Sequence, residues 1–227
     1  MNIANNILKH SLQNVYFLTG TALAGKTTMA KALAEKHGFL WYDENYTGEP
    51  FKKWETICDE KYQPLKAKRD SRHSKQEKYD WDAHYNRPAE EIIAEGAGRS
   101  LNDEFVEFMM IELVKLSQNN KVVTNIFAPY DLLLEVSDYN RIACLLAAPH
   151  LVTTVNYGSR DDHKSYLKWI TSLNEPEKKI AKQDEIFRIG IERTFEEAKK
   201  HNLFSIVRTE ESTVEGTLNL LEEHFGL

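Results

Sequence analysis

Glycine, lysine and threonine residues lie close together near the start of the chain, in the stretch GTALAGKTT. Four residues separate Gly20 from Gly25, and Lys26, Thr27 and Thr28 follow directly. Glycine allows a backbone to curl with its N–H groups turned inward, where they can surround an anion. A lysine beside such a loop adds a positive charge, and a hydroxyl group is an oxygen ligand that suits Mg²⁺. These residues at this spacing indicate a site for a chain of phosphates and its metal ion.

The segment between the two glycines joins a predicted strand to a predicted helix. Residues 15–19 are β-branched, aromatic or aliphatic, which is typical of a buried strand in a parallel sheet. From Lys26 onward, apolar residues recur at helical spacing as far as His37, and Gly38 provides a stop. The first turn of such a helix has unpaired N–H groups and the positive end of the helix dipole, so the junction favours an anion.

The same residues match G-x-x-x-x-G-K-[ST], the P-loop pattern, whose lysine reaches the β- and γ-phosphates and whose hydroxyl ligates Mg²⁺. We therefore expect the chain to bind a nucleoside triphosphate, with ATP and Mg²⁺ as its ligands. A glycine-rich turn with an incidental lysine is the alternative interpretation. The residues expected to contact the nucleotide are Gly20, Thr21, Ala22, Ala24, Gly25, Lys26, Thr27 and Thr28.

Short apolar runs alternate with helical patterns along the rest of the chain. Pro88 stands at the start of a predicted helix at 88–98, and Gly96 and Gly98 are expected to end it. Residues 157–200 are polar with helical periodicity, and a last helix is predicted at 213–225. Alternating strands and helices predict an α/β fold with a five-stranded parallel sheet and helices on both faces. The four further strands are predicted at 39–42, 121–127, 142–148 and 204–208.

Composition favours small substrates over polymers. The chain has 227 residues, enough for one α/β domain with an insertion, and a net charge of -6, which gives no reason to expect nucleic acid or an anionic membrane as a partner. It contains no apolar run of membrane-spanning length, and residues 1–10 do not form a signal sequence, so we expect a cytoplasmic protein. Cys58 and Cys144 form no metal or redox motif.

The order of these elements resembles the P-loop small-molecule kinases, namely the nucleoside monophosphate, shikimate and chloramphenicol phosphotransferase-like kinases. The resemblance implies a three-layer P-loop NTPase fold in a single domain over 1–227, with a helical insertion at 48–87 on the acceptor side and a lid at 157–200. It also implies an acidic residue after the second strand, an arginine from the lid and a loop beside the adenine after the last strand. The matching positions are Asp43, Arg160 and Arg208.

One position departs from the pattern of that family. The strand at 121–127 has Asn125 where these proteins usually place an aspartate that helps to hold Mg²⁺. Asparagine can accept a hydrogen bond from a metal-bound water but carries no charge. The metal is then left to Thr27, the phosphate oxygens and Asp43.

The expected catalytic residues are Lys26, Asp43 and Arg160. A carboxylate at the end of a strand can align an acceptor hydroxyl and take its proton, and a lid arginine can neutralise charge on the transferred phosphoryl group. The alternatives are a solvated Asp43 that caps the next turn and an Arg160 paired at the surface with Asp161 or Asp162.

The acceptor is expected near the aromatic and basic stretch that ends at Arg87. Trp81 and Tyr85 are candidates for stacking on a planar acceptor, and Arg87 and Arg99 for holding its anionic group. The alternative is that the aromatic residues pack on the core and that the cations are surface charges at helix ends.

Two functions follow from these residues. The first is a kinase that moves the γ-phosphate of ATP to a small-molecule acceptor of unknown identity. The second is a nucleotide-binding switch or regulatory ATPase without such an acceptor, which Asn125 favours because it brings no charge to the metal. The residues do not decide whether the base of the nucleotide is adenine or guanine. They do not define the oligomeric state either.

Overall fold

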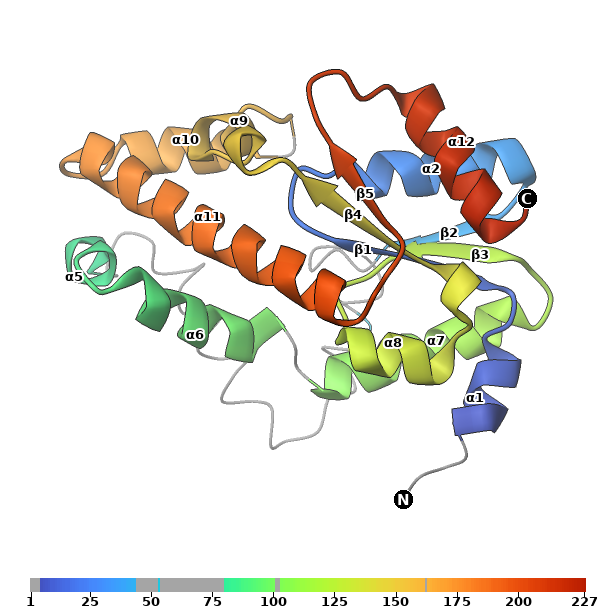
Figure 1. Ribbon diagram of the computed structural model, residues 1–227. Coiled ribbons are helices and arrows are strands. Elements are labelled where there is room, and N and C mark those ends of the chain that lie inside the picture. The colour runs from blue at the N-terminus through green and yellow to red at the C-terminus, as the bar shows by residue number, and fades with distance from the viewer. Residues whose placement is uncertain (1–4, 44–52, 54–79, 101–102, 162) are drawn as a thin grey trace.

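The computed structural model describes residues 5–43, 53, 80–100, 103–161 and 163–227. Strands and helices alternate along this part of the chain (Figure 1). The strands are β1 (Val15–Gly20), β2 (Leu40–Asp43), β3 (Val122–Asn125), β4 (Ile142–Ala147) and β5 (Ser205–Arg208). The α-helices are α1 (Asn5–Ser11), α2 (Lys26–His37), α5 (Trp81–Tyr85), α6 (Ala89–Ser100), α7 (Asp103–Ser117), α8 (Tyr130–Val136), α9 (Thr154–Gly158), α10 (Lys164–Thr171), α11 (Pro176–Lys200) and α12 (Val214–Phe225), with short 3-10 turns at Tyr139–Arg141 and Pro149–Leu151.

The five strands form one parallel sheet with the order β2-β3-β1-β4-β5. β1 lies in the middle, paired with β3 on one side and β4 on the other. The chain therefore goes from β1 toward one edge of the sheet and later returns to build the other edge. In an open parallel sheet, ligands bind at the carboxyl ends of the strands where this change of direction occurs, which here is the end of β1.

Two clusters of buried side chains cover the two faces of the sheet. Val15 and Phe17 of β1 belong to one cluster, with apolar residues of α7 and α8. Tyr16 and Leu18 belong to the other, with residues of α2 and α12. Successive side chains of a strand point to opposite faces, so this alternation shows that helices cover both. Figure 1 shows α2 and α12 above the sheet and α7 and α8 below it.

The predicted fold class is confirmed as an α/β protein with a five-stranded parallel sheet flanked by helices. Each predicted strand is present, with small differences at the ends. β2, for example, begins at Leu40 and includes Asp43. α2 ends as predicted, because Gly38 adopts a left-handed conformation with φ of 67° and its N–H donates to the carbonyl of Ala34.

The helix predicted from Pro88 does not end at its glycines. α6 begins at Ala89 and continues through Gly96 and Gly98 to Ser100. A glycine inside a helix costs about 1 kcal/mol relative to alanine, but it ends the helix only where its backbone leaves the helical conformation. Of the predicted insertion at 48–87, residue 53 and residues 80–87 are described.

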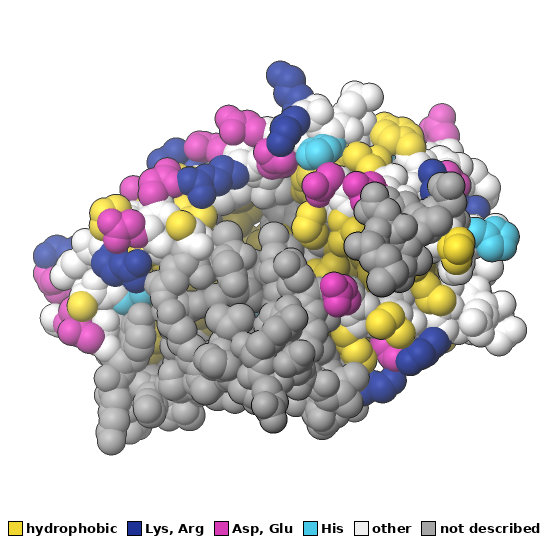
Figure 2. Space-filling model, turned by 90° about the horizontal axis from the view of Figure 1, so that it is seen from below, with side chains coloured by type: hydrophobic (Ala, Val, Ile, Leu, Met, Phe, Trp, Pro, Cys, Tyr) yellow, Lys and Arg dark blue, Asp and Glu magenta, His cyan; other side chains and the backbone are white. Residues whose placement is uncertain are grey.

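Acidic and basic side chains alternate over much of the described surface. Figure 2, which views the molecule from below, shows Lys and Arg interspersed with Asp and Glu along the upper left of that face. On α11 the charges pair along the helix, as in Lys182 with Glu185 and Arg188 with Glu192. None of the described helices has both the length and the apolar character needed to cross a membrane.

Gly20 closes β1 at a point where the backbone of β4 leaves no room for a side chain. Its φ is +117°, and a Cβ atom built there would lie 1.9 Å from the carbonyl oxygen of Leu145. We predict that Gly20→Ala lowers the free energy of unfolding by about 3 kcal/mol, because it combines backbone strain with a clash against main-chain atoms. Urea unfolding followed by circular dichroism measures the change.

Gly190 provides the matched control. It lies within α11, and a Cβ atom there would meet no heavy atom within 4 Å beyond its chain neighbours and the nearby backbone of its own helix. Gly190→Ala should raise the stability by about 1 kcal/mol through helix propensity alone. Equal stability of the two variants would show that the approach of β1 to β4 is not constrained as described.

Candidate functional site

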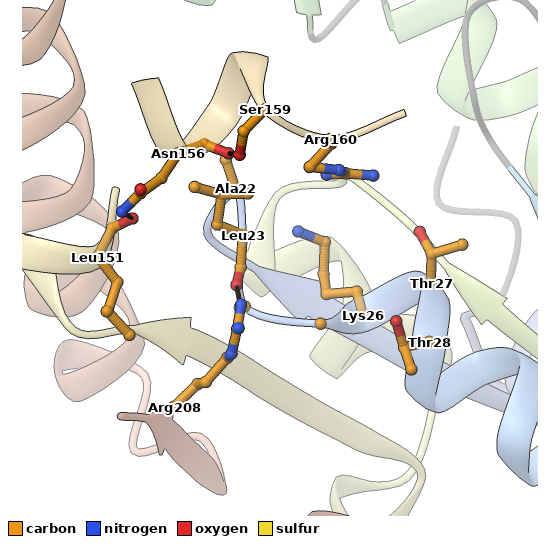
Figure 3. Close-up of a pocket in the computed structure, with 12 residues that line it drawn as sticks. Ala22, Leu23, Lys26, Thr27, Thr28, Leu151, Asn156, Ser159, Arg160 and Arg208 are labelled. Atoms are coloured by element: carbon orange, nitrogen blue, oxygen red, sulfur yellow. Dashed lines mark hydrogen bonds between the residues drawn. The ribbon is translucent and has the colours of Figure 1, made fainter. Parts of the chain in front are cut away.

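A cavity of about 570 Å³ opens at the carboxyl edge of the sheet (Figure 3). Its walls are residues 22–28, the segment around α9 and the end of β5. Among the described residues that line it, Lys26, Arg160 and Arg208 are basic and none is acidic. In a chain with a net charge of -6, three cations around one cavity make a local site for an anion.

The glycine loop, residues 20–25, is anchored to β4 by Thr21. The N–H group of Thr21 donates to the carbonyl of Leu145 at 3.0 Å, and its hydroxyl accepts from the N–H group of Ala147 at 2.7 Å. Thr21 is buried by these contacts and does not line the cavity. Thr21 and Gly20, both predicted to contact the nucleotide, therefore hold the loop in place, and the residues that follow form the wall.

The loop turns into α2 through two left-handed residues. Leu23 has φ of 58° and Gly25 has φ of 87°, and Gly25 forms the N-cap of the helix. No side-chain cap hydrogen bond is described at this end, and the first turn of α2 has no acidic residue. The first N–H groups of the helix and its dipole are thus directed at the cavity, an arrangement that suits an anion.

Lys26 lies over the glycine loop. Its Nζ donates to the carbonyls of Thr21 at 2.6 Å and Gly20 at 3.2 Å, and it is 5.5 Å from the centre of the Phe127 ring. These contacts keep the ammonium group beside the loop N–H groups. Phosphate oxygens placed in the loop would offer the ammonium group stronger, charged acceptors than carbonyl oxygens.

Arg160 enters the cavity from the segment between α9 and α10. Figure 3 shows it above the glycine loop, on the same side as Lys26. Asp184 of α11 holds the start of α9, because its Oδ1 accepts from both the N–H and the hydroxyl of Thr154 at 2.6 Å. Inside α9, Asn156 donates to the carbonyl of Leu151 at 3.0 Å. The segment that carries Arg160 is therefore fixed to α11 at its base.

A second cavity of about 200 Å³ adjoins the first on the side of β5. Both are lined by Ala24, Gly25, Thr28 and Arg208, so the two form neighbouring parts of one site. Arg208 donates from its guanidinium to the carbonyl of Leu23 (Figure 3). The rest of the second wall includes Met29, Leu145 and Ile206 with hydroxyl groups from the start of α12. Apolar side chains beside a few polar groups suit a flat ring.

Asp43 and Asn125 end the adjacent strands β2 and β3 and lie side by side in the sheet register. Asn125 is buried, and its Nδ2 donates to Oδ1 of Asp43 at 2.8 Å. The indole Nε1 of Trp41 donates to Oδ1 of Asn125 at 2.9 Å. Asp43 is not among the described residues that line either cavity.

Trp81, Tyr85 and Arg87, three of the predicted acceptor residues, are not among the residues that line these cavities. Tyr85 is buried, its hydroxyl donates to Oε1 of Gln183 at 3.2 Å, and burial raises its pKa, so it remains a donor. The Trp81 ring packs against Trp169 of α10 with centroids 4.5 Å apart. Arg87 pairs with Glu91 at 3.6 Å. The side chain of Arg99 is outside the described part of the chain. A role for these four in acceptor binding stays a prediction.

Several residues of the site were not predicted from the sequence. Leu23, Leu151, Asn156 and Ser159 all line the larger cavity. Thr153 caps α9 by accepting from the backbone N–H of Asn156 at 3.1 Å, and threonine is a preferred residue at a helix start. Leu151 and Ser159 have no such signal in the sequence, because only the packing of α9 against α11 brings them to the glycine loop.

A metal ion at this site would need ligands from outside the described residues. In the part of the chain that is described, no group of three or more His, Cys, Asp or Glu residues could hold a metal ion. The hydroxyl of Thr27 and the carboxylate of Asp43 are oxygen donors, which suit Mg²⁺, and Mg²⁺ commonly takes its remaining ligands from phosphates and water.

No protein-family model matches this chain, and no curated protein sequence matches it significantly.

We predict that the segment carrying Arg160 becomes ordered by nucleotide. Addition of ATP and Mg²⁺ should slow amide hydrogen exchange in residues 157–169, because phosphate oxygens would engage Arg160 from the far side of the cavity. α8 lies at the other face of the sheet and serves as the internal control. Equal exchange of residues 157–169 with and without ATP would contradict the prediction.

Proposed function

We propose that this chain is a kinase of the P-loop class that transfers the γ-phosphate of ATP to a small-molecule acceptor, with Mg²⁺ as cofactor. The observation that carries the proposal is the larger cavity, where Lys26, Arg160 and Arg208 surround a glycine loop at the start of a helix. A triphosphate supplies the negative charge and oxygen acceptors that this cavity is built to bind.

The position of the site in the sheet supports a nucleotide. The strand order β2-β3-β1-β4-β5 places the glycine loop at the end of the central strand, where ligands bind in parallel sheets. The phosphates would lie in the loop and the base in the smaller cavity beside Arg208 and Ile206. The γ-phosphate would then point away from β5, toward the ends of β3 and β2.

The predicted catalytic residues would contribute charge neutralisation and proton transfer to the proposed reaction. The acceptor oxygen forms a bond to the γ-phosphorus while the bond from that phosphorus to the bridging oxygen breaks, and ADP leaves with the electron pair. Lys26 and Arg160 would neutralise charge on the phosphoryl oxygens, and Asp43 would align the acceptor hydroxyl and take its proton. Thr27, Asp43 and phosphate oxygens would hold Mg²⁺, which would supply further charge neutralisation.

A second candidate function is a nucleotide-dependent switch, which the uncharged Asn125 at the end of β3 favours. The two candidates differ in their response to an acceptor. ADP release should be measured with ATP and Mg²⁺ alone and with a panel of nucleosides, nucleotides, sugars and antibiotics. Release that depends on one acceptor class supports the kinase, and slow release that ignores every acceptor supports the switch. Cytoplasmic location and the absence of nucleic-acid partners remain predictions of the sequence.

Lys26→Ala should weaken ATP binding by about 100-fold, because it removes a charged donor from a preformed anion site. Isothermal titration with ATP measures the change, and circular dichroism checks that the fold is retained. Lys200→Ala removes an exposed lysine that pairs with Glu197 and should bind ATP like the parent chain. Unaltered ATP binding by Lys26→Ala would refute the nucleotide site.

Asp43→Asn should reduce acceptor-dependent turnover by about 100-fold or more while leaving ATP affinity within a factor of two, because the group that takes the proton is lost. Initial rates at saturating ATP and the best acceptor of the panel measure it. Asp138→Asn is the control, since Asp138 is an exposed residue paired with Lys9. Parent-like turnover in Asp43→Asn excludes a role in proton transfer.

A further inference from the structure

Asn125 is a buried amide whose two ends are both engaged. It is 6% exposed, its Oδ1 lies 2.9 Å from Trp41 Nε1, and its Nδ2 lies 2.8 Å from Asp43 Oδ1. An indole N–H can only donate, and a carboxylate oxygen can only accept. The orientation of the amide is therefore dictated by its partners, with the oxygen toward Trp41 and the nitrogen toward Asp43.

This orientation decides whether the amide oxygen of Asn125 can accept a hydrogen bond from a metal-bound water. The sequence suggested that its oxygen could accept a hydrogen bond from a metal-bound water. In the structure that oxygen is directed at the indole of Trp41, away from Asp43, and the nitrogen faces the only carboxylate that ends either strand. Asn125 thus serves as a donor to Asp43.

The three residues lie on the face of the sheet that α2 covers. Val123 of β3 belongs to the core cluster that contains residues of α2, and Trp41 packs against the same cluster. Asn125 follows Val123 by two residues, and Asp43 follows Trp41 by two, so both share that face. Lys31 of α2 lies 4.6 Å from the centre of the Trp41 ring. The carboxylate of Asp43 is thereby held on the side of the sheet where α2 begins with Lys26 and Thr27.

We propose that Asn125 is a positioning residue for Asp43, and that a neutral donor is required at the end of β3. The proposal rests on the proposed function, in which Asp43 aligns the acceptor. Trp41 fixes the orientation of the Asn125 amide, and the amide fixes one oxygen of Asp43. The carboxylate of the site is then provided by β2 and not by β3. Asn125 is then a specific part of the site and does not represent a lost aspartate.

The proposal predicts that Asn125→Asp lowers turnover, whereas a metal site that lacks its aspartate would gain turnover from the same change. Asn125→Asp keeps the shape and the acceptor for Trp41 but replaces the donor to Asp43 by a second carboxylate oxygen, and two like charges in contact repel. Turnover should fall by about 10- to 100-fold, the usual effect of removing a partner that orients a ligand or catalytic group. A missing aspartate would give the reverse, a rise in turnover on its restoration.

Trp41→Phe is the second variant, and it preserves an aromatic ring beside Lys31 while removing the N–H donor. Its turnover should fall by about 10-fold with ATP affinity within a factor of two of the parent. Asn120→Asp is the matched control for the exchange of amide and carboxylate, because Asn120 is exposed in the turn before β3. Turnover in Asn125→Asp or Trp41→Phe equal to that of Asn120→Asp overturns the proposal.

A measurement without nucleotide separates this inference from the proposed function. The chain has four tryptophans, and the indole N–H signal that Trp41→Phe removes from an ¹⁵N correlation spectrum identifies Trp41. Asp43→Ala should speed hydrogen exchange of that indole by about 10-fold, because the Asn125 amide then loses its fixed orientation. An unchanged exchange rate overturns the coupling. Absence of ATP binding by the parent chain would instead refute the kinase and leave this coupling measurable.

Discussion

The contact between Gly20 and the backbone of Leu145 is the constraint on which the candidate site depends. A Cβ atom at residue 20 would lie 1.9 Å from the Leu145 carbonyl oxygen, so β1 and β4 can meet at this point only through glycine. The same carbonyl accepts from Thr21, whose hydroxyl in turn accepts from Ala147. Because strands β1 and β4 are joined this closely, the loop bends outward over the edge of the sheet. This bend sets the positions of the loop N–H groups, of the start of α2 and of Lys26.

Charge is concentrated at the site by elements that are far apart in the sequence. Lys26 comes from the loop, Arg160 from the segment after α9, and Arg208 from the end of β5. Lys26 and Arg208 donate from their charged ends to backbone carbonyls of the loop. The hydrogen bonds from Thr154 to Asp184 hold the start of α9, the helix that precedes Arg160. The result is a basic cavity in an acidic chain, a distribution that favours anionic ligands at one place and repels them elsewhere.

The sheet and the glycine loop could be predicted from the sequence because both depend on local patterns. Short apolar runs such as 142–148 mark buried strands, and the loop pattern combines spacing with a strand and a helix on either side. The remainder of the site depends on tertiary packing. Ser159 lines the cavity after α9, a helix whose start Asp184 holds, and the hydroxyl of Tyr85 donates to Gln183. The role of Asn125 could not be predicted from the sequence, because its two hydrogen-bonding partners define the direction of its amide.

The central position of β1 has a consequence for synthesis on the ribosome. Among the five described strands β1 is made first, yet its hydrogen-bonding partners begin at Val122 and Ile142. Until those residues have emerged, the glycine loop has neither β3 beside it nor the Leu145 carbonyl that shapes it. Pairing between segments so distant in sequence closes a large loop and is slow. A nascent chain therefore carries the complete loop sequence long before the loop can take its shape, and β1 is an exposed apolar segment during that interval.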